Sequence, residues 1–111
     1  MHARLGRVVV RGRSMQPTLY DGDQLLVRYG AEPRPGRLAV VRLPGGPLSV
    51  KRVTFRDPDG WWVERDNPAE GVDSWQVGAV PDADVLAVVW CRYWPPRRRR
   101  RRSRDREGNV D

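Results

Sequence analysis

Short runs of β-branched and aromatic residues recur along the chain, and turn residues bound each run. The runs occupy residues 7–10, 24–29, 37–43, 48–55, 61–64 and 85–93. Between them lie "YDGD", "PRPG", "PGGP" and "DPDG", which are typical turn and loop sequences. No window sustains a helical period. The pattern predicts one small, mainly β domain, with hairpins at "RLPGGPL" and "FRDPDGWW".

The composition changes abruptly after Tyr93. Residues 97–111 carry eight arginines against three acidic residues, which places +5 of the net charge of +7 in this segment. A run of like charges repels itself and cannot form a core, so we expect a domain over residues 1–96 and a disordered basic tail over residues 97–111. Such a tail could bind nucleic acid or anionic lipid. We favour the simpler interpretation, in which the tail only solubilises the domain or has no specific role.

Cysteine and histidine occur once each, as Cys91 and His2. These counts exclude a disulfide framework and leave a zinc site of several Cys or His ligands unsupported. A catalytic site of the Ser-His-Asp or Cys-His type would have to recruit His2 from the chain terminus. We therefore expect no metal and no cofactor. Cys91 alternates with apolar neighbours, which predicts a small buried side chain.

The longest apolar run, "VLAVVWC" at residues 85–91, is far shorter than the roughly 20 residues needed to cross a bilayer. The first residues, "MHARLGRVVVRGR", contain no signal-peptide core. Together with the single cysteine, these features predict a soluble, cytoplasmic protein.

Lys51 is the only lysine among 21 basic residues. Codon bias would leave an occasional lysine on a solvated surface. Alternatively, this position requires a base, because a desolvated lysine amine can lose its proton whereas an arginine guanidinium cannot. Strand alternation places Ser49, Lys51, Val53 and Phe55 on one face, and an apolar face would desolvate the amine. Lys51 is therefore a candidate base.

A partner for this base lies in "SMQPTLYDGD" at residues 14–23, which is followed by an apolar strand and later by "VKR". This string resembles the Ser-Lys peptidases of the signal peptidase I and LexA-like clan, whose nucleophile lies in a Ser-Met-x-Pro-Thr motif. "ERDNPAEGVDSWQVGAVP" at residues 64–81 is similar to a further block of the signal peptidases. The resemblance covers residues 7–90 and implies a fold of the signal peptidase and LexA catalytic-domain type.

Within the clan, the chain is most similar to the nickel-type superoxide dismutase maturation proteases. It shares their short length, the "YG" after the second strand and the "WWV" before the Asp-Asn block. This resemblance implies that the substrate is a precursor protein or peptide, and that the reaction removes an N-terminal leader from a nickel superoxide dismutase precursor.

Carried over to this chain, the resemblance implies that Ser14 is the nucleophile and Lys51 the general base. The backbone N–H of Ser14 would help to bind the oxyanion. A base that works near neutrality needs a pKa of about 7–8, so burial must destabilise the lysine ammonium by about 4 kcal/mol. Met15 is expected to pack beneath the nucleophile or to line the substrate groove.

Two positions depart from the clan pattern. Signal peptidases often carry a serine that completes the oxyanion hole where this chain has Gly12, and a serine that orients the lysine where it has Gly71. Oxyanion stabilisation must therefore depend on backbone donors. Asp73 and Ser74 are the candidates for the group that positions Lys51.

The other conspicuous residues are expected to be structural. Asp66 and Asn67 carry short polar side chains that can satisfy backbone groups of the loop beneath the site. Four aromatic residues at strand ends lack interleaved basic residues, so we interpret them as core and rim residues, not as a base-stacking platform. They are Trp61, Trp62, Trp90 and Trp94.

Three other functions remain possible. A general signal-peptidase-like enzyme would share the site. A LexA-like domain would cleave its own chain, but only 13 residues precede Ser14, which favours cleavage of another molecule. A non-catalytic basic module would bind nucleic acid or anionic lipid through the tail and would retain that binding without Ser14.

Overall fold

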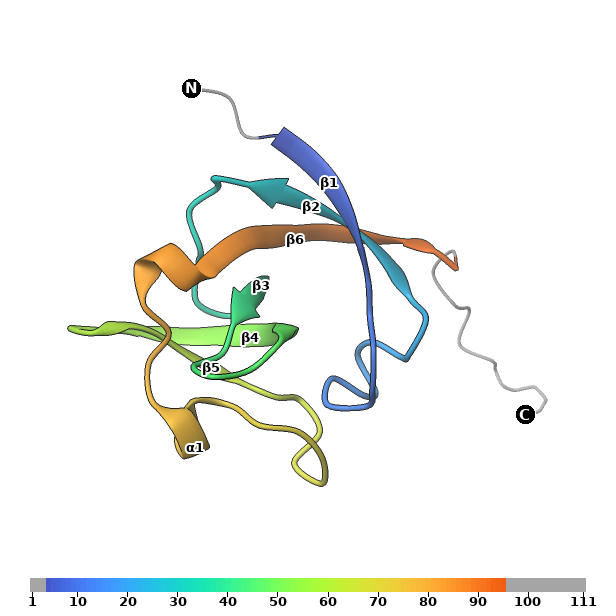
Figure 1. The fold of residues 1–111 in the computed structure, drawn as a ribbon. Helices are drawn as coiled ribbons and strands as arrows, with labels where there is room; N and C mark the ends of the chain where they lie inside the picture. The colour runs from blue at the N-terminus through green and yellow to red at the C-terminus, as the bar shows by residue number, and fades with distance from the viewer. Residues whose placement is uncertain (1–3, 96–111) are drawn as a thin grey trace.

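The apolar runs of the sequence form six strands of one sheet in the computed structural model, which describes residues 4–95 (Figure 1). The strands are β1 (Arg4–Val9), β2 (Gln24–Tyr29), β3 (Leu38–Arg42), β4 (Leu48–Asp57), β5 (Gly60–Glu64) and β6 (Val85–Trp94). The predicted mainly β class is confirmed. The basic tail predicted over residues 97–111 lies outside the described residues.

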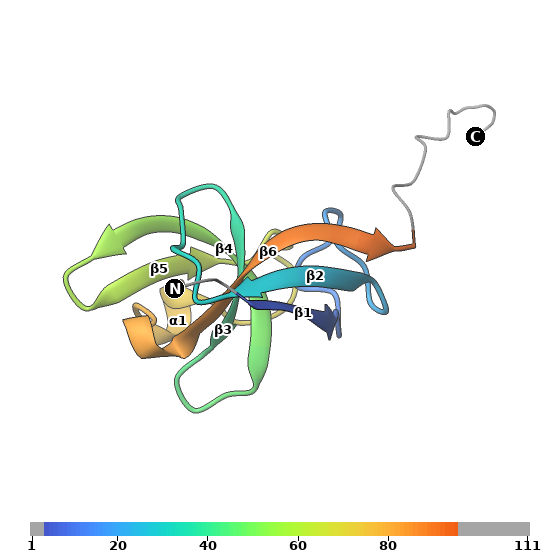
Figure 2. The same cartoon turned by 90° about the horizontal axis from the view of Figure 1, so that it is seen from above.

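The strands are ordered β1-β2-β6-β3-β4-β5, and every neighbouring pair is antiparallel. The hairpins predicted between β3 and β4 and between β4 and β5 are confirmed. The last strand, β6, lies between β2 and β3 and so joins the two halves of the sheet. In Figure 2 the β4–β5 hairpin extends away from the β1–β2–β6 half, which points to the opposite side.

Strand β3 is buried on both faces, because successive side chains of a strand point in opposite directions. Val40 packs in one core cluster, whereas Ala39 and Val41 pack in the other. The first cluster contains Val10, Met15, Leu19, Leu25, Val27, Val40, Ala87 and Val89. The second contains Ala39, Val41, Leu43, Val53, Trp61, Val63 and Val80. The domain therefore has one core cluster on each face of β3.

Cys91 is exposed, so the prediction of a buried cysteine is wrong. Val27 of β2 pairs with Val89, whereas Leu26 pairs with Cys91, which leaves Trp90 as an extra residue in β6. An extra residue reverses the alternation of side chains along a strand. Cys91 therefore lies on the face opposite to the buried Val89.

A second register shift displaces Phe55. Val53 pairs with Val63, but Phe55 pairs with Trp62, so one residue of β4 has no partner on β5. Phe55 consequently stacks on Trp62, with ring centroids 5.6 Å apart, and remains 48% exposed. The expectation that Phe55 shares the buried face of its strand with Lys51 is wrong.

The four tryptophans noted in the sequence divide between core and surface. Trp61 is buried in the second core cluster, and Trp62 is partly buried beneath its stacking partner. Trp90 and Trp94 are more than half exposed near the end of β6. This distribution agrees with their interpretation as core and rim residues.

The helices are short. Helix α1 (Ser74–Val77) has four residues, and the 3-10 helix η1 (Asp82–Asp84) has three. Nothing helical in residues 4–95 is therefore long or apolar enough to cross a membrane. The β1–β2 connection and the segment between β5 and α1 lie side by side below the sheet in Figure 1, and this is where the candidate site forms.

Candidate active site

Ser14 lies in the connection between β1 and β2, where the chain turns tightly. Gln16 N–H donates to the Arg13 carbonyl at 3.1 Å, and Leu19 N–H donates to the Met15 carbonyl at 2.9 Å. Met15 is 2% exposed within the first core cluster and so anchors the turn. Because its neighbour is buried in this way, Ser14 is held at the surface and remains half-buried.

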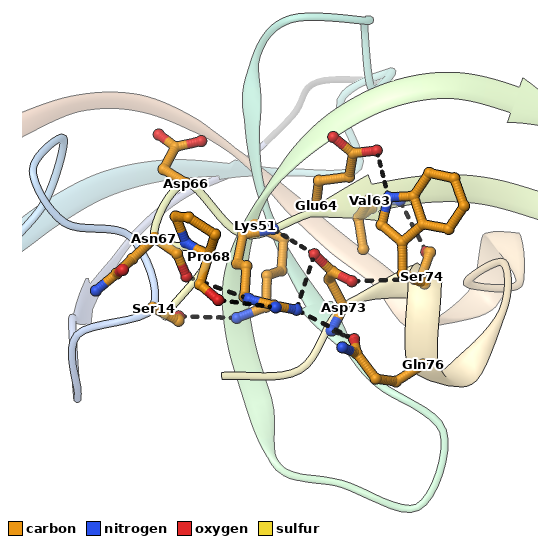
Figure 3. A network of polar contacts seen from close by, with 12 residues as sticks. Ser14, Lys51, Val63, Glu64, Asp66, Asn67, Pro68, Asp73, Ser74 and Gln76 are labelled. Carbon is orange, nitrogen blue, oxygen red and sulfur yellow. Dashed lines mark hydrogen bonds and ion pairs between the residues drawn. The ribbon is translucent and has the colours of Figure 1, made fainter. Parts of the chain in front are cut away.

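Lys51 approaches Ser14 from the other half of the sheet. It lies on β4 opposite Ala39 of β3, and only 2% of its surface is exposed. Its Nζ donates to Ser14 Oγ at 2.9 Å, across 37 residues of sequence (Figure 3). The fold therefore brings together the two residues that the sequence selects as nucleophile and base.

The surroundings of Lys51 favour a neutral amine. Burial lowers its pKa below the ordinary value; the Asp73 carboxylate opposes this effect and the Arg65 guanidinium adds to it. Among the described residues, the Nζ makes its single hydrogen bond to Ser14 and forms no ion pair. A lysine ammonium has three N–H donors, so it would be poorly satisfied here.

Backbone donors near Ser14 differ in their availability. Gly12 has φ 86°, and its N–H donates to Asp21 Oδ1 at 2.7 Å. The Ser14 N–H, by contrast, has no acceptor within residues 4–95. An amide without a protein acceptor beside a serine hydroxyl can stabilise a developing oxyanion. The structure thus places the Gly12 amide in a turn and leaves the Ser14 amide available.

Asp66 links three segments beneath the site. It accepts hydrogen bonds from Arg52 Nε at 2.9 Å, from Arg52 Nη2 at 2.7 Å and from Thr18 Oγ1 at 2.6 Å. Burial by itself would raise the pKa of Asp66, but the hydrogen bonds from Arg52 and Thr18 more than offset it and hold the pKa below its usual value. The carboxylate therefore ties the segment after β5 to β4 and to the Ser14 turn.

Asn67 bonds directly to the turn that carries Ser14. Its Nδ2 donates to the Arg13 carbonyl at 2.9 Å, and its backbone N–H donates to the Ser14 carbonyl at 2.8 Å. Its Oδ1 accepts from the Ala69 N–H at 3.0 Å. Asn67 thus fixes two successive carbonyls of the turn and stiffens its own loop.

Neither Asp73 nor Ser74 donates to or accepts from Lys51. Asp73 is 3% exposed and caps the first turn of α1, while its Oδ2 accepts from the Arg65 backbone N–H at 3.0 Å. Ser74 Oγ accepts from the Val63 N–H at 2.9 Å and so supports β5. Of the two candidates, only Asp73 acts on Lys51, and it acts through its charge.

Arg65 is a member of the site that our sequence reasoning missed. Its side chain is 17% exposed, and its Nη1 lies 3.3 Å from Asp73 Oδ2. Arg65 is one of 20 arginines in the chain, so its residue type alone does not distinguish it. The available clue was its position, directly before the Asp66-Asn67 pair.

A cavity of about 180 Å³ adjoins Ser14. It lies between the end of β1, an edge strand of the sheet, and residues 48–50 of β4, which pair with β3 alone. Its lining is mostly apolar and consists of Val8, Val9, Val10, Arg11, Ser14, Met15, Val40, Leu48, Ser49 and Val50. This apolar lining suits an apolar side chain of a bound molecule. No cluster of three His, Cys, Asp or Glu side chains that could hold a metal occurs in the described part of the chain.

A comparison with known protein families finds a match. The family model described as Peptidase S24-like matches residues 2–89, a span that contains every residue of the candidate site. A comparison with curated proteins finds no match.

Proposed function

Because the chain belongs to the Peptidase S24-like family, whose members are serine peptidases or self-cleaving proteins, we propose that it hydrolyses peptide bonds with Ser14 as nucleophile and Lys51 as general base. One observation carries this proposal. The Nζ of a buried lysine with a lowered pKa lies 2.9 Å from a serine hydroxyl beside an open cavity. Serine needs such a base, because its own hydroxyl is a weak nucleophile.

In the proposed acylation step, the neutral Lys51 amine accepts the hydroxyl proton while Ser14 Oγ attacks the scissile carbonyl carbon. The Ser14 N–H stabilises the negative charge that develops on the carbonyl oxygen. The tetrahedral intermediate then collapses as the C–N bond breaks, and the Lys51 ammonium returns the proton to the departing amine. The acyl group remains on Ser14 as an ester.

Water completes the reaction. It attacks the ester carbonyl while Lys51 accepts one of its protons, and the C–O bond to Ser14 breaks. The proton returns to Ser14 Oγ, and the product leaves with a new carboxylate. Asp66 and Asn67 support both steps indirectly, because their hydrogen bonds hold the turn on which Ser14 lies.

We further propose that the substrate is the extended N-terminal leader of a precursor protein, in particular a nickel superoxide dismutase precursor. The sequence resemblance to the maturation proteases of that enzyme supports this choice. The cavity supports an extended substrate, since β1 and residues 48–50 of β4 each offer a strand edge to which a peptide can add. Such a reaction would take place in the cytoplasm, on an accessible leader.

Co-expression tests the substrate. A nickel superoxide dismutase precursor produced with the wild-type chain should lose its leader and begin at the first residue of the mature enzyme, whereas the Ser14→Ala variant should leave the leader attached. Mass spectrometry of the new N-terminus gives the answer. An intact leader alongside cleavage of a secretory signal peptide would instead assign a general signal-peptidase-like role.

Self-cleavage is the second candidate, because a Peptidase S24-like domain also fits a self-cleaving function. Its signature is loss of a fixed segment from the wild-type chain itself, at a rate independent of protein concentration. Cleavage of an added peptide that rises with enzyme concentration supports action on another molecule. A basic module without catalysis would show salt-sensitive binding to nucleic acid or anionic lipid that survives Ser14→Ala.

A further inference from the structure

The guanidinium of Arg65 lies at the centre of a polar network beside Lys51. Arg65 directly follows β5, and its side chain reaches back over the segment that leads to α1. Four acceptors surround it: the Asn67 carbonyl at 3.2 Å from Nε, the Pro68 carbonyl at 3.1 Å from Nη2, and Gln76 Oε1 at 3.2 Å and Asp73 Oδ2 at 3.3 Å from Nη1. One side chain therefore joins β5, the loop and the start of α1.

This network borders the reacting pair directly. A β-carbon built on Gly71 would lie 2.5 Å from Ser14 Cβ and 3.6 Å from Arg65 Cδ, so the loop fills the space between these two side chains. On the other side, the capping carboxylate of Asp73 is 3% exposed and lies close enough to influence Lys51 (Figure 3).

We propose, on the basis of the function assigned to Ser14 and Lys51, that Arg65 is a positioning residue for that pair. Its guanidinium compensates the buried Asp73 carboxylate, so that Lys51 faces an ion pair instead of a lone negative charge. Its hydrogen bonds to the two loop carbonyls hold the loop against Ser14.

The electrostatic argument follows from burial. A lone carboxylate near a buried amine favours the protonated amine, which cannot accept a proton from Ser14. Two charged groups act on Lys51 from the neighbouring elements: Asp73, which caps α1, and Arg65, at the end of β5. The two other carboxylates of this loop have arginine partners: Asp66 forms an ion pair with Arg52, and Glu70 lies 3.9 Å from Arg13. Loss of the Arg65 charge would therefore leave Asp73 unopposed.

The sequence makes the test direct, because Lys51 is the only lysine of the chain. Protein labelled with ¹³C at the lysine ε-carbon gives one signal, whose shift with pH reports the titration of Lys51 without any substrate. The variants are Arg65→Gln, Asp73→Asn and the double variant. Arg56→Gln is the matched control, since it removes an arginine from an exposed ion pair with Asp82 that does not act on Lys51.

Arg65→Gln should raise the titration midpoint of Lys51 by about one pH unit or more, and Asp73→Asn should lower it. The double variant should return close to wild type, because the two charges oppose each other. Arg56→Gln should leave the midpoint unchanged. Arg65→Lys keeps the charge but loses the fork of donors, so it should lower the melting temperature and move the Lys51 midpoint little. This variant gives a second lysine signal, which is assigned by adding Lys51→Arg, because only the new lysine then remains.

A folded Arg65→Gln protein whose Lys51 titrates at the wild-type pH would overturn the proposal and reduce Arg65 to a structural brace. If Arg65→Gln fails to fold, Arg65→Lys is compared with Asp73→Asn instead. Equal shifts of the Lys51 titration midpoint in these two variants would contradict the proposal. If Lys51 titrates as expected in all variants but the wild-type protein cleaves no peptide, the proposed peptidase function is wrong, whereas the charge coupling between Arg65, Asp73 and Lys51 is supported.

Discussion

Gly71 lies against Ser14 so closely that a β-carbon at residue 71 would be 2.5 Å from the Ser14 β-carbon. Its φ of 95° also lies in a region that residues with side chains rarely adopt. We therefore expect Gly71→Ala to displace the Ser14 hydroxyl from Lys51. A shift of about 1 Å can cost about 100-fold in activity, and the backbone strain should cost about 1–3 kcal/mol of stability.

Gly78→Ala is the control for backbone strain. Gly78 has φ 87°, but a β-carbon there would meet no atom within 4 Å. Both variants should lose stability, whereas only Gly71→Ala should lose peptide cleavage. Steady-state kinetics and thermal melts of the two proteins measure the difference. Equal activity in both would show that the close contact with Ser14 is unimportant.

The pH dependence of cleavage should follow Lys51. Burial lowers the pKa of the amine, and only the neutral amine can accept a proton, so kcat/KM should be low below that pKa and reach a plateau above it. Measurement of kcat/KM between about pH 5 and 10 gives the midpoint, which should match the ¹³C titration of Lys51. A rate independent of pH over this range argues against a lysine base.

Lys51→Met should abolish cleavage and stabilise the fold. The unfolded chain keeps the lysine proton up to pH 10.5, whereas the folded protein loses it at lower pH, so the buried amine costs stability. Methionine of similar size removes that cost, which predicts a gain of about 0.5–2 kcal/mol at neutral pH. The gain should shrink as the pH rises towards 10.5. Chemical denaturation at pH 7 and 10 measures it, and a destabilised variant would contradict the prediction.

Asp66→Asn should destabilise the protein in a pH-dependent way. The pKa of Asp66 is held below 3.8 in the folded state, so its contribution is present above that value and is lost as the pH falls through the folded pKa. Hydrogen bonds to a charged group predict a loss of about 1.5–3 kcal/mol at pH 7. The difference in the free energy of unfolding between wild type and Asp66→Asn should therefore become smaller towards pH 2–3, and urea denaturation at pH 7 and at pH 2–3 measures it. An equal difference at the two pH values would show that the charge of Asp66 does not contribute to stability.

Much of the fold could be predicted from the sequence because the strands follow simple patterns. The apolar runs coincide with β2 to β6 within two residues at each end, and turn residues mark both hairpins. The register shifts of the sheet escaped prediction, among them the bulges that place Cys91 and Phe55. An extra residue in β4 or β6 depends on how the strand pairs with its neighbour, and single-strand alternation contains no trace of it. The misplacement of Cys91 and Phe55 follows from this alone.

Some residues of the candidate site could likewise be predicted from the sequence, and others could not. Ser14 and Lys51 stood out because one lies in a distinctive motif and the other is the single lysine in an arginine-rich chain. The polar partners were less predictable, since Asp73 is bound by Arg65 and caps a four-residue helix that has no periodic signal. Which donors a buried carboxylate finds depends on the packing of three separate segments, not on local sequence.

Cleavage of a leader-derived peptide by wild-type protein, Ser14→Ala and Lys51→Arg is the most direct test of the Ser14–Lys51 pair. Arginine preserves positive charge and approximate size but cannot accept the proton from Ser14. Mass spectrometry should therefore find a new N-terminus with wild-type protein and none with either variant, while circular dichroism shows all three folded. Turnover by Lys51→Arg near the wild-type rate would contradict the assignment of Lys51 as the base.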